Sequence, residues 1–478
     1  MGRRTKIVAT VGPSSENEAV VREMLQAGMD VARLSLAHGT LDEAAGRLRL
    51  VRKVAKQEDR EVGILVDLPG PKIRLANFGE HSVLLSEGSA IQLRVGNQIS
   101  TSSVIEVDYE GLLNDVEVGD RLTIGDGRAV IEITDGDSEY LSASVVHGGS
   151  LTGCPGLHIP ADRLSLHAPT EADLKALEYF LKLDIDMVAL SFVRSADDLY
   201  RLPVDPHPQG PLVIAKIETR AAIENLSSII EASGAVMVAR GDLGSECSIE
   251  ELPILQKEII RQCIKLGRPA ITATQMLESM ILAPEPTRAE ASDVANAVWD
   301  GSSALMLSGE TAVGGDPANV VRTMARIAER ADDEFDHSGW LAELSRTRFA
   351  DKEDSDGSIT DAMTHASARA LNELGIKTIL CVSGTGFTVR SMARFRPESQ
   401  ILGLSSNVKT LRQLTLSWGT KPIYMSEEGD LQQRVSAALD RARDLEWVAV
   451  DELVAVLAGT DSRSRFTNAL RIERVAAP

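Results

Sequence analysis

The order of strands and helices implied by apolar spacing is the feature that most constrains this fold. Eight short runs of apolar, mostly β-branched residues are separated by longer segments, most of which carry apolar residues at helical spacing. Parallel strands need crossovers of this length, and eight strand–helix units are the number that closes a (β/α)8 TIM barrel. The predicted strands are Lys6–Gly12, Val31–Leu36, Val62–Leu68, Met187–Val193, Leu212–Glu218, Ala235–Arg240, Pro269–Thr274 and Ser303–Ser308.

One interval interrupts this alternation. Between Arg74 and about Pro160 the helical spacing disappears, and Gly125-Asp126-Gly127 between two apolar runs predicts a hairpin. We expect a small all-β domain inserted after the third barrel strand. There it would lie over the C-terminal face of the barrel and act as a lid, with a passive insertion as the alternative. Its predicted strands are Ser82–Leu85, Ala90–Val95, Arg121–Ile124, Ala129–Thr134 and Tyr140–Val146.

A polar stretch after the last predicted barrel helix marks the next boundary. Residues 336–358 are polar, and Asp351–Gly357 is typical of a linker. Beyond it, strands and helices predict an open α/β layer. The predicted domains are a barrel at residues 1–74 and 161–345, a lid at 75–160 and a C-terminal domain at 346–478. The C-terminal elements are Ile359–Leu374, Thr378–Ser383, Gln400–Ser405, Lys421–Met425, Leu431–Arg443 and Asn468–Val475.

The composition excludes several classes of function. With 70 acidic and 50 basic residues the net charge is -20, which disfavours nucleic acid as a partner. No apolar run approaches the ~20 residues that span a bilayer, and the N-terminus lacks the apolar region of a signal peptide. The four cysteines show no paired spacing, which suits a reducing compartment. We therefore expect a cytoplasmic enzyme without a membrane partner.

Charged side chains stand at the C-terminal ends of two neighbouring predicted strands. In the run LVIAKIET, alternation along the strand puts Lys216 and Glu218 on the same face. The next strand runs into Arg240, Gly241 and Asp242. Two carboxylates and an ammonium that converge there suit an oxygen-ligated divalent cation beside an anionic substrate. Taken singly, Lys-x-Glu is more often a surface ion pair and Gly-Asp more often a turn.

Other predicted strand ends also carry polar residues, and strand ends converge at one face of a barrel. The combination of cations with carboxylates favours phosphate chemistry assisted by a metal. In or just after the second strand stand Arg33, Ser35 and His38, at the third Asp67, Lys72 and Arg74, at the seventh Thr274, and at the eighth Ser308 and Glu310.

Several long motifs resemble the pyruvate kinase family over essentially the whole chain. They include KIVATVGPSS, LVDLPGPKIR, IAKIET, MVARGDLG, ATQMLESM with the downstream PTRAE, and LMLSGETAVGGDP. The resemblance implies a TIM barrel with an inserted small β-barrel lid and an open C-terminal α/β domain with a regulatory role. It also implies a homotetramer that transfers the phosphoryl group of phosphoenolpyruvate to ADP with Mg²⁺ or Mn²⁺, giving pyruvate and ATP.

The resemblance assigns roles to residues at matching positions. Glu218 and Asp242 would bind the metal, and Lys216 would neutralise charge on the transferring phosphoryl group and on the enolate. Arg33 would bind the phosphoryl group. Thr274 would contact the substrate and, with ordered water, belong to the proton relay that completes pyruvate.

Further roles follow in the same way. Ser308 would share the proton relay, with Glu310 as a more distant member. Arg74 and His38 would lie on the nucleotide side, although an ordinary structural histidine is the alternative for His38. The substrate carboxylate would be held by backbone N–H groups where a short helix opens. These groups belong to Ala239, Arg240, Gly241 and Asp242.

The sequence departs from potassium-dependent relatives at the monovalent-cation site. Ser35 and Ala37 stand where those relatives have Asn and Ser, and Leu68 stands where they have Thr. Asp67 is retained, whereas Lys72 replaces a Glu. Because potassium needs several oxygen ligands, we expect the Lys72 ammonium to stand in for the ion as a partner of Asp67, which makes potassium unnecessary. Neutral drift at an exposed loop is the alternative.

The predicted C-terminal domain carries a second candidate site. A turn rich in glycine and hydroxyl groups between a strand and a helix can hold a phosphate through backbone N–H groups. The resemblance places the family's effector site here, so we expect a phosphorylated effector such as a sugar phosphate or a nucleotide monophosphate. A plain turn is the alternative. The residues are Ser383, Gly384, Thr385, Gly386 and Thr388.

Two other functions stay open at this point. An aldolase or lyase barrel that forms pyruvate enolate at a Mg²⁺ site would use Glu218 and Asp242 but would need no nucleotide. A catalytically weakened homologue would act as a metabolite sensor, although intact Lys216 and Arg33 argue against it. Dependence on ADP separates the first alternative, and turnover without an effector separates the second. The stretch Cys154–Pro160 departs from the family pattern, which leaves the lid's contacts to substrate open.

Overall fold

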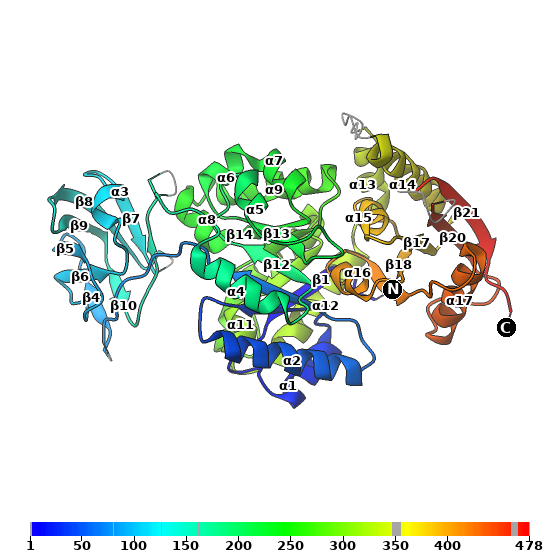
Figure 1. Cartoon of the computed structure of the whole chain (residues 1–478), viewed down its shortest axis with the longest axis horizontal. Helices are drawn as coiled ribbons and strands as arrows, with labels where there is room; N and C mark the ends of the chain where they lie inside the picture. The colour runs from blue at the N-terminus through cyan, green and yellow to red at the C-terminus, as the bar shows by residue number, and fades with distance from the viewer. Residues whose placement is uncertain are drawn as a thin grey trace.

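Three parts follow one another along the molecule. The computed structural model describes residues 2–79, 81–125, 127–160, 163–346, 355–459 and 467–477. Figure 1 shows a β-rich part at one end, a central barrel wrapped in helices, and an α/β part at the other end. The chain leaves the barrel after β3 (Gly63–Leu68), forms the β-rich part, and returns at α4 (Glu171–Leu181). The inserted strands and the C-terminal part therefore lie at opposite ends of the barrel.

The central strands form a closed, eight-stranded parallel barrel, which confirms the predicted fold class. β1 and β16 close the ring, with Lys6 opposite Ala304. The strand ends differ from the predicted ones by at most three residues. The strands are β1 (Lys6–Thr10), β2 (Val31–Ser35), β3, β12 (Met187–Leu190), β13 (Leu212–Ile217), β14 (Ala235–Ala239), β15 (Ala270–Ala273) and β16 (Ala304–Leu307).

Helices surround the barrel and bury its outer surface. Alternate strand side chains such as Leu65 and Met237 fill the interior, while their neighbours pack under the helices. A capping box of Thr170 and Asp173 opens α4. Because the interior is filled with apolar side chains, polar groups can gather only at the strand ends. The helices are α1 (Glu18–Ala27), α2 (Leu41–Gln57), α5 (Ala196–Tyr200), α6 (Arg220–Glu224), α7 (Leu226–Ala232), α8 (Arg240–Glu246), α9 (Leu252–Lys265), η1 (Glu278–Ile281), α10 (Arg288–Asp300), α11 (Gly309–Ala312) and α12 (Pro317–Asp333).

The inserted part has its own buried core and two sheets, one of six strands in the order β11-β7-β8-β9-β5-β6 and one of β10 with β4. The predicted hairpin is confirmed: β7 and β8 are antiparallel, and Gly125 and Gly127 have φ of +60° and +93°. β6, β10, β11 and α3 were not predicted. The elements are β4 (Val83–Leu85), β5 (Ala90–Val95), β6 (Val104–Val107), α3 (Leu112–Asp115), β7 (Arg121–Ile124), β8 (Ala129–Gly136), β9 (Leu141–His147), β10 (Gly149–Leu151) and β11 (Leu157–His158).

The C-terminal part is a five-stranded sheet in the order β19-β18-β17-β20-β21 with helices against it. The predicted linker Asp351–Gly357 is wrong at its C-terminal end, because α14 begins at Ser355; residues 347–354 lie outside the described residues. The polar stretch before this linker contains the helix α13 (His337–Arg346), which was not predicted. β20 and α16 were not predicted. The elements are α14 (Ser355–Leu374), β17 (Thr378–Val382), α15 (Phe387–Ala393), β18 (Gln400–Ser405), α16 (Val408–Leu414), β19 (Thr420–Tyr424), α17 (Leu431–Asp444), β20 (Leu453–Ala458) and β21 (Ala469–Arg474).

Contacts near α16 attach the C-terminal part to the barrel. Gln413 Nε2 donates to the carbonyl oxygens of Asp186 and Gly210, both at 3.1 Å. Leu416 packs with the apolar side chains of the barrel interior. All four cysteines are free. Within the described ranges, none of the helices combines the length and the apolar character that a membrane crossing requires.

Candidate active site at the barrel mouth

Lys216 is the centre of the candidate site. It lies near the C-terminal end of β13, and its Nζ is 2.8 Å from Glu218 Oε1 and 3.5 Å from Asp67 Oδ1. All three side chains are buried. Burial alone would lower the pKa of Lys216, but Asp67, Glu218 and Asp242 raise it above its ordinary value. The ammonium is therefore a permanent positive charge held in place by two carboxylates.

The end of β12 supplies two groups that the sequence analysis did not identify. Ser191 Oγ accepts a hydrogen bond from Lys216 Nζ at 2.6 Å and donates one to Leu68 O at 2.7 Å. The N–H of Phe192, whose φ is +56°, donates to Glu218 Oε2 at 2.7 Å. A left-handed backbone is costly for a bulky residue and is kept where the surroundings demand it. The sequence could have indicated these two residues, because they lie near the C-terminal end of the fourth predicted strand.

Asp67 connects two of the predicted cations. Its Oδ2 lies 2.7 Å from Arg33 Nε, while its Oδ1 faces Lys216. Arg33 also donates to Thr10 Oγ1 on β1 at 2.9 Å. Burial would raise the pKa of Asp67, but Lys216 and Arg33 lower it below its ordinary value. This buried carboxylate therefore fixes two cations at the barrel mouth before any anionic ligand arrives.

Lys72 does not occupy the predicted position. Its Nζ is 3.3 Å from Asp242 Oδ1, whereas the cationic partners of Asp67 are Arg33 and Lys216. The expected pairing of Lys72 with Asp67 is wrong because Asp67 is already neutralised. Burial would raise the pKa of Asp242, but Lys72 and Lys216 lower it overall. The fixed charge of Lys72 thus acts on a candidate metal ligand. Ser35 lies opposite Asp67 in the register of β2 and β3.

Glu218 and Asp242 offer hard oxygen ligands of the kind Mg²⁺ prefers. Burial raises the pKa of Glu218; Lys216 opposes this rise, and the charge of Asp242 adds to it. The buried Glu218 and the partly exposed Asp242 repel each other, and a divalent cation would stabilise the pair. Within the described ranges no group of three His, Cys, Asp or Glu side chains could hold a metal ion. The pair fits Mg²⁺ if a substrate or water supplies the remaining oxygens.

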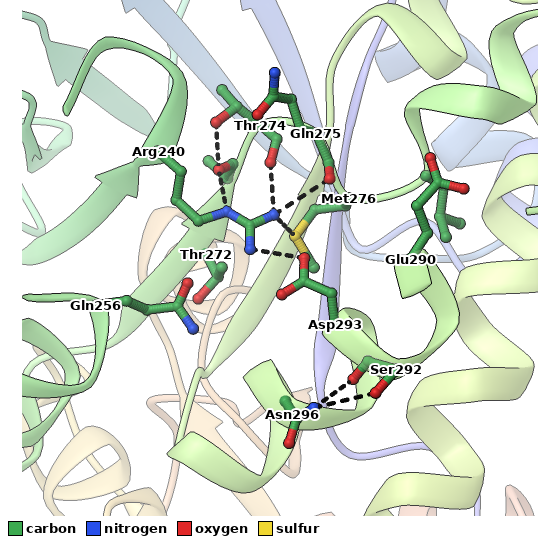
Figure 2. A network of polar contacts seen from close by, with 12 residues as sticks. Arg240, Gln256, Thr272, Thr274, Gln275, Met276, Glu290, Ser292, Asp293 and Asn296 are labelled. Carbon is green, nitrogen blue, oxygen red and sulfur yellow. Dashed lines mark hydrogen bonds and ion pairs between the residues drawn. The ribbon is translucent and has the colours of Figure 1, made fainter. Parts of the chain in front are cut away.

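The side chain of Arg240 holds the segment that follows β15. Figure 2 shows its guanidinium between this segment and α10. Its nitrogen atoms lie 3.3, 2.7 and 3.4 Å from the carbonyl oxygens of Ala273, Thr274 and Gln275. A fourth contact, of 2.7 Å, joins Nη1 to Asp293 Oδ2. The side chain therefore supports the segment from one side, whereas the sequence analysis considered only the backbone of Arg240.

Thr274 and Gln275 have left-handed backbones, with φ of +68° and +53°. Thr274 Oγ1 accepts a hydrogen bond from the N–H of Gly241 at 2.8 Å and donates one to Ala273 O at 2.6 Å. The structure thus brings together two of the predicted substrate-binding positions. Ala239 is the N-cap of α8, which carries Asp242 in its first turn.

The two candidates on the last strand differ in their surroundings. Ser308 Oγ is buried and has no hydrogen-bond partner among the described residues. Both carboxylate oxygens of Glu310 are occupied, because they accept the N–H groups of Leu277 at 3.1 Å and of Ser308 at 2.7 Å. Glu310 is also completely buried. Its contacts are those of a structural acceptor and give no support to the predicted role in a proton relay.

Arg74 and His38 lie where the lid meets the barrel. Arg74 donates to the carbonyl oxygens of Ala37 at 3.2 Å and of Cys154 at 3.4 Å. Partial burial lowers the pKa of His38, and the positive charges of Arg74 and Lys72 lower it further. The imidazole is therefore neutral at pH 7 and lies close to several cations.

The predicted effector turn contains one accessible stretch. Gly384 and Thr385 are exposed, whereas Ser383, Gly386 and Thr388 are buried. Gly386 has φ of +78° and caps α15, which supports the prediction of a glycine turn before a helix. The hydroxyl of Thr388 is not available there, because it lies 2.6 Å from the hydroxyl of Thr467.

Comparisons with known proteins agree over nearly the whole length. The family model described as "Pyruvate kinase, barrel domain" matches residues 2–321, and the one described as "Pyruvate kinase, alpha/beta domain" matches residues 361–473. The proteins named pyruvate kinase from Staphylococcus aureus strains USA300 and NCTC 8325 / PS 47 are each 36% identical over 478 residues. Each alignment covers 99% of this chain and 80% of the relative.

Proposed function

This chain belongs to the pyruvate kinase family, and we propose that it transfers the phosphoryl group of phosphoenolpyruvate to ADP at the buried Lys216 cluster, with Mg²⁺ bound by Glu218 and Asp242. The observation that carries the proposal is the Lys216 ammonium, enclosed by Glu218 at 2.8 Å and Asp67 at 3.5 Å. A cation held this rigidly stabilises negative charge that develops on a transferring phosphoryl group. The enzyme acts in the cytoplasm and assembles as a homotetramer.

Arg33 and Lys216 have different roles in binding and catalysis. Arg33 holds the phosphoryl group while Asp67 and Thr10 keep its guanidinium oriented. Lys216 compensates charge on the same group and on the enolate, and Ser191 fixes the direction of its side chain. Glu218 and Asp242 would hold the metal, which would supply a Lewis acid to the substrate.

A proton must then reach the enolate to give pyruvate. Thr274 and Ser308 are the hydroxyl groups proposed for this step. The Oγ of Ser308 supports its part, since it has no hydrogen-bond partner among the described residues that would engage its proton. Thr274 is held by the N–H of Gly241 and by Ala273 O, which orients its hydroxyl. Arg74 and the neutral His38 lie on the side of the nucleotide.

Potassium is not required, because Lys72 supplies a fixed charge at the site. The ammonium lies 3.3 Å from Asp242, so it lowers the pKa of that carboxylate and keeps it ionised for the metal. Lys72 pairs with Asp242 and not with Asp67, but the result is the same: the protein itself supplies the positive charge beside the substrate that a monovalent ion would otherwise supply.

The C-terminal domain binds a phosphorylated effector and is regulated by it. The exposure of Gly384 and Thr385 in the predicted effector turn supports this part of the proposal.

The test measures pyruvate formation from phosphoenolpyruvate and ADP with Mg²⁺, first in a bulky organic cation and then with potassium added. We expect full activity without potassium. Lys72→Glu should become dependent on potassium, because it places a carboxylate where the ammonium was. Lys175→Glu, at an exposed position on α4, is the matched control and should behave as the parent chain does.

Two results would count against the proposal. If the parent chain is active only with potassium, the kinase assignment stands and the argument from Lys72 fails. If no pyruvate forms in either condition, with phosphorylated effectors also tried, the role of the Lys216 cluster in turnover is wrong.

A further inference from the structure

A small cavity, partly open to solvent, lies between the barrel and the C-terminal part, on the side away from Lys216. It is formed by the turns that follow α9 and α10, by α15, and by the segment that follows α16. Its volume is about 20 Å³, which is room for one small ion or water and not for an organic ligand. Four of the side chains that line it are guanidinium groups: Arg268, Arg390, Arg394 and Arg396.

Arg390 has no negative partner among the residues that the structure describes. It is 2% exposed, and its Nη2 donates to Thr385 O at 3.1 Å and lies 2.9 Å from His207 Nε2. Its Nε and Nη1 are buried without any hydrogen-bond partner in the described ranges. Burial, together with Arg390 and Arg268, lowers the pKa of His207 to about 3, so its imidazole is neutral at pH 7. Both partners of Arg390 are therefore uncharged.

The other three guanidinium groups use their donors differently. Arg394 forms an ion pair with Asp361 at 2.8 Å. Arg396 donates to two carbonyl oxygens at 2.8 and 2.5 Å, and Arg268 to two others at 3.4 and 3.3 Å. Burial and the nearby Arg268 lower the pKa of Arg390 to about 9, which still leaves it charged at pH 7. Burying such a charge without compensation is strongly unfavourable, so Arg390 is the group that needs a ligand.

We propose that this cavity binds a small inorganic anion of the size of chloride, held by Arg390 and by the hydroxyl of Ser417. Ser417 lines the cavity, is 1% exposed, and its Oγ has no hydrogen-bond partner in the described part of the chain. Guanidinium N–H groups and a hydroxyl are all donors, so together they suit an anion and not a cation. The anion compensates Arg390, which has no ion pair among the described residues and two guanidinium nitrogens without a hydrogen-bond partner there.

The position of this site gives it a structural consequence. Arg390 donates to Thr385 O in the exposed turn of the C-terminal part and contacts His207 in the barrel. A bound anion fixes the guanidinium between these two partners. It therefore stabilises the contact between the barrel and the C-terminal part, and the expected readout is thermal stability and not turnover.

The experiment compares thermal unfolding of the full chain in sodium chloride and in sodium gluconate at equal ionic strength. We expect Tm to be about 1–3 °C higher in chloride, because a ligand of the folded state alone stabilises it. Arg390→Met should lose this difference, and Ser417→Ala should reduce it. Arg52→Met is the matched control, since Arg52 already pairs with Asp186 at 2.6 Å. It should lower Tm equally in both salts.

Crystals grown in sodium bromide give an independent result. We expect an anomalous peak within hydrogen-bond distance of Arg390 Nε or Nη1 and of Ser417 Oγ. No peak in the cavity, together with an equal chloride effect in the parent chain and in Ser417→Ala, would overturn the proposal. These two measurements decide the matter even if Arg390→Met does not fold.

Discussion

Replacing Arg240 by Met tests whether its side chain keeps the catalytic segment in shape. The best of its three hydrogen bonds to backbone carbonyl oxygens, 2.7 Å to Thr274 O, contributes ~1.5–3 kcal/mol because the donor is charged. The contacts at 3.3 and 3.4 Å contribute less. The left-handed backbones of Thr274 and Gln275 cost ~1–3 kcal/mol each, so the segment stays in place only while it is held.

Without the hydrogen bonds of Arg240, the observed conformation of this segment should lose ~2–4 kcal/mol of stability relative to relaxed conformations. At ~1.4 kcal/mol per factor of ten, kcat should fall by about 30- to 1,000-fold, with a much smaller change in the KM for phosphoenolpyruvate. Asp293→Asn is the informative control. It removes the ion pair, whose carboxylate is 35% exposed, but leaves the bonds to the carbonyl oxygens, so kcat should fall less than about fivefold.

The assays are ADP-dependent formation of pyruvate and, separately, uptake of deuterium into the methyl group of pyruvate. The second assay follows proton transfer alone, the step for which the hydroxyl of Thr274 is proposed. Arg240→Met should impair both. The reasoning is refuted if Arg240→Met keeps more than a third of the parent kcat, or if Asp293→Asn and Arg240→Met lose equal activity.

Two further outcomes follow from buried carboxylates. Glu310→Gln should lower the free energy of unfolding by ~1–3 kcal/mol in a denaturant titration, because an amide NH₂ must face one of the two N–H groups that Glu310 accepts. A normal unfolding curve with loss of proton transfer would instead make Glu310 a relay group. Burial raises the pKa of Asp186 to about 6, against the lowering effects of Arg52 and the Ile64 N–H, so its folded pKa exceeds its unfolded value of about 4. Its contribution to stability is therefore present below about pH 4 and lost as pH rises through about 6, and Asp186→Asn should flatten the dependence of Tm on pH between these values.

The barrel could be predicted because its strand–helix unit repeats eight times and parallel strands can be connected in few ways. Eight apolar runs separated by crossover-length segments have few arrangements, and the strand ends followed to within three residues. Elements whose apolar residues show neither helical nor strand periodicity were not predicted. β20 is the continuous apolar run Leu453–Ala458, and such a run does not distinguish a buried strand from a buried helix. The helix α13 was not predicted because it lies within the polar stretch at residues 336–358, and Leu344 is its only buried side chain.

The residues of the site could be predicted, but not how they pair. Lys216 and Glu218 stand two positions apart on one strand, so their shared face follows from alternation. Lys72 lies in a loop that follows Gly70, whose φ is +67°, and the direction of this loop decides which carboxylate it meets. No property of the sequence fixes that direction. Ser191 was overlooked for another reason, since the end of the fourth strand was not considered with the others.

The same requirement for charge balance applies at both ends of the barrel. At the mouth, the cations Arg33, Lys72 and Lys216 face the carboxylates Asp67, Glu218 and Asp242, so the cluster is close to neutral before any ligand binds. A divalent metal alone would leave it with excess positive charge, and a phosphorylated carboxylate alone with excess negative charge. The two ligands together restore the balance, which favours their joint binding. At Arg390 the described residues supply a cation without a carboxylate partner, and the same requirement there calls for the proposed anion from solution.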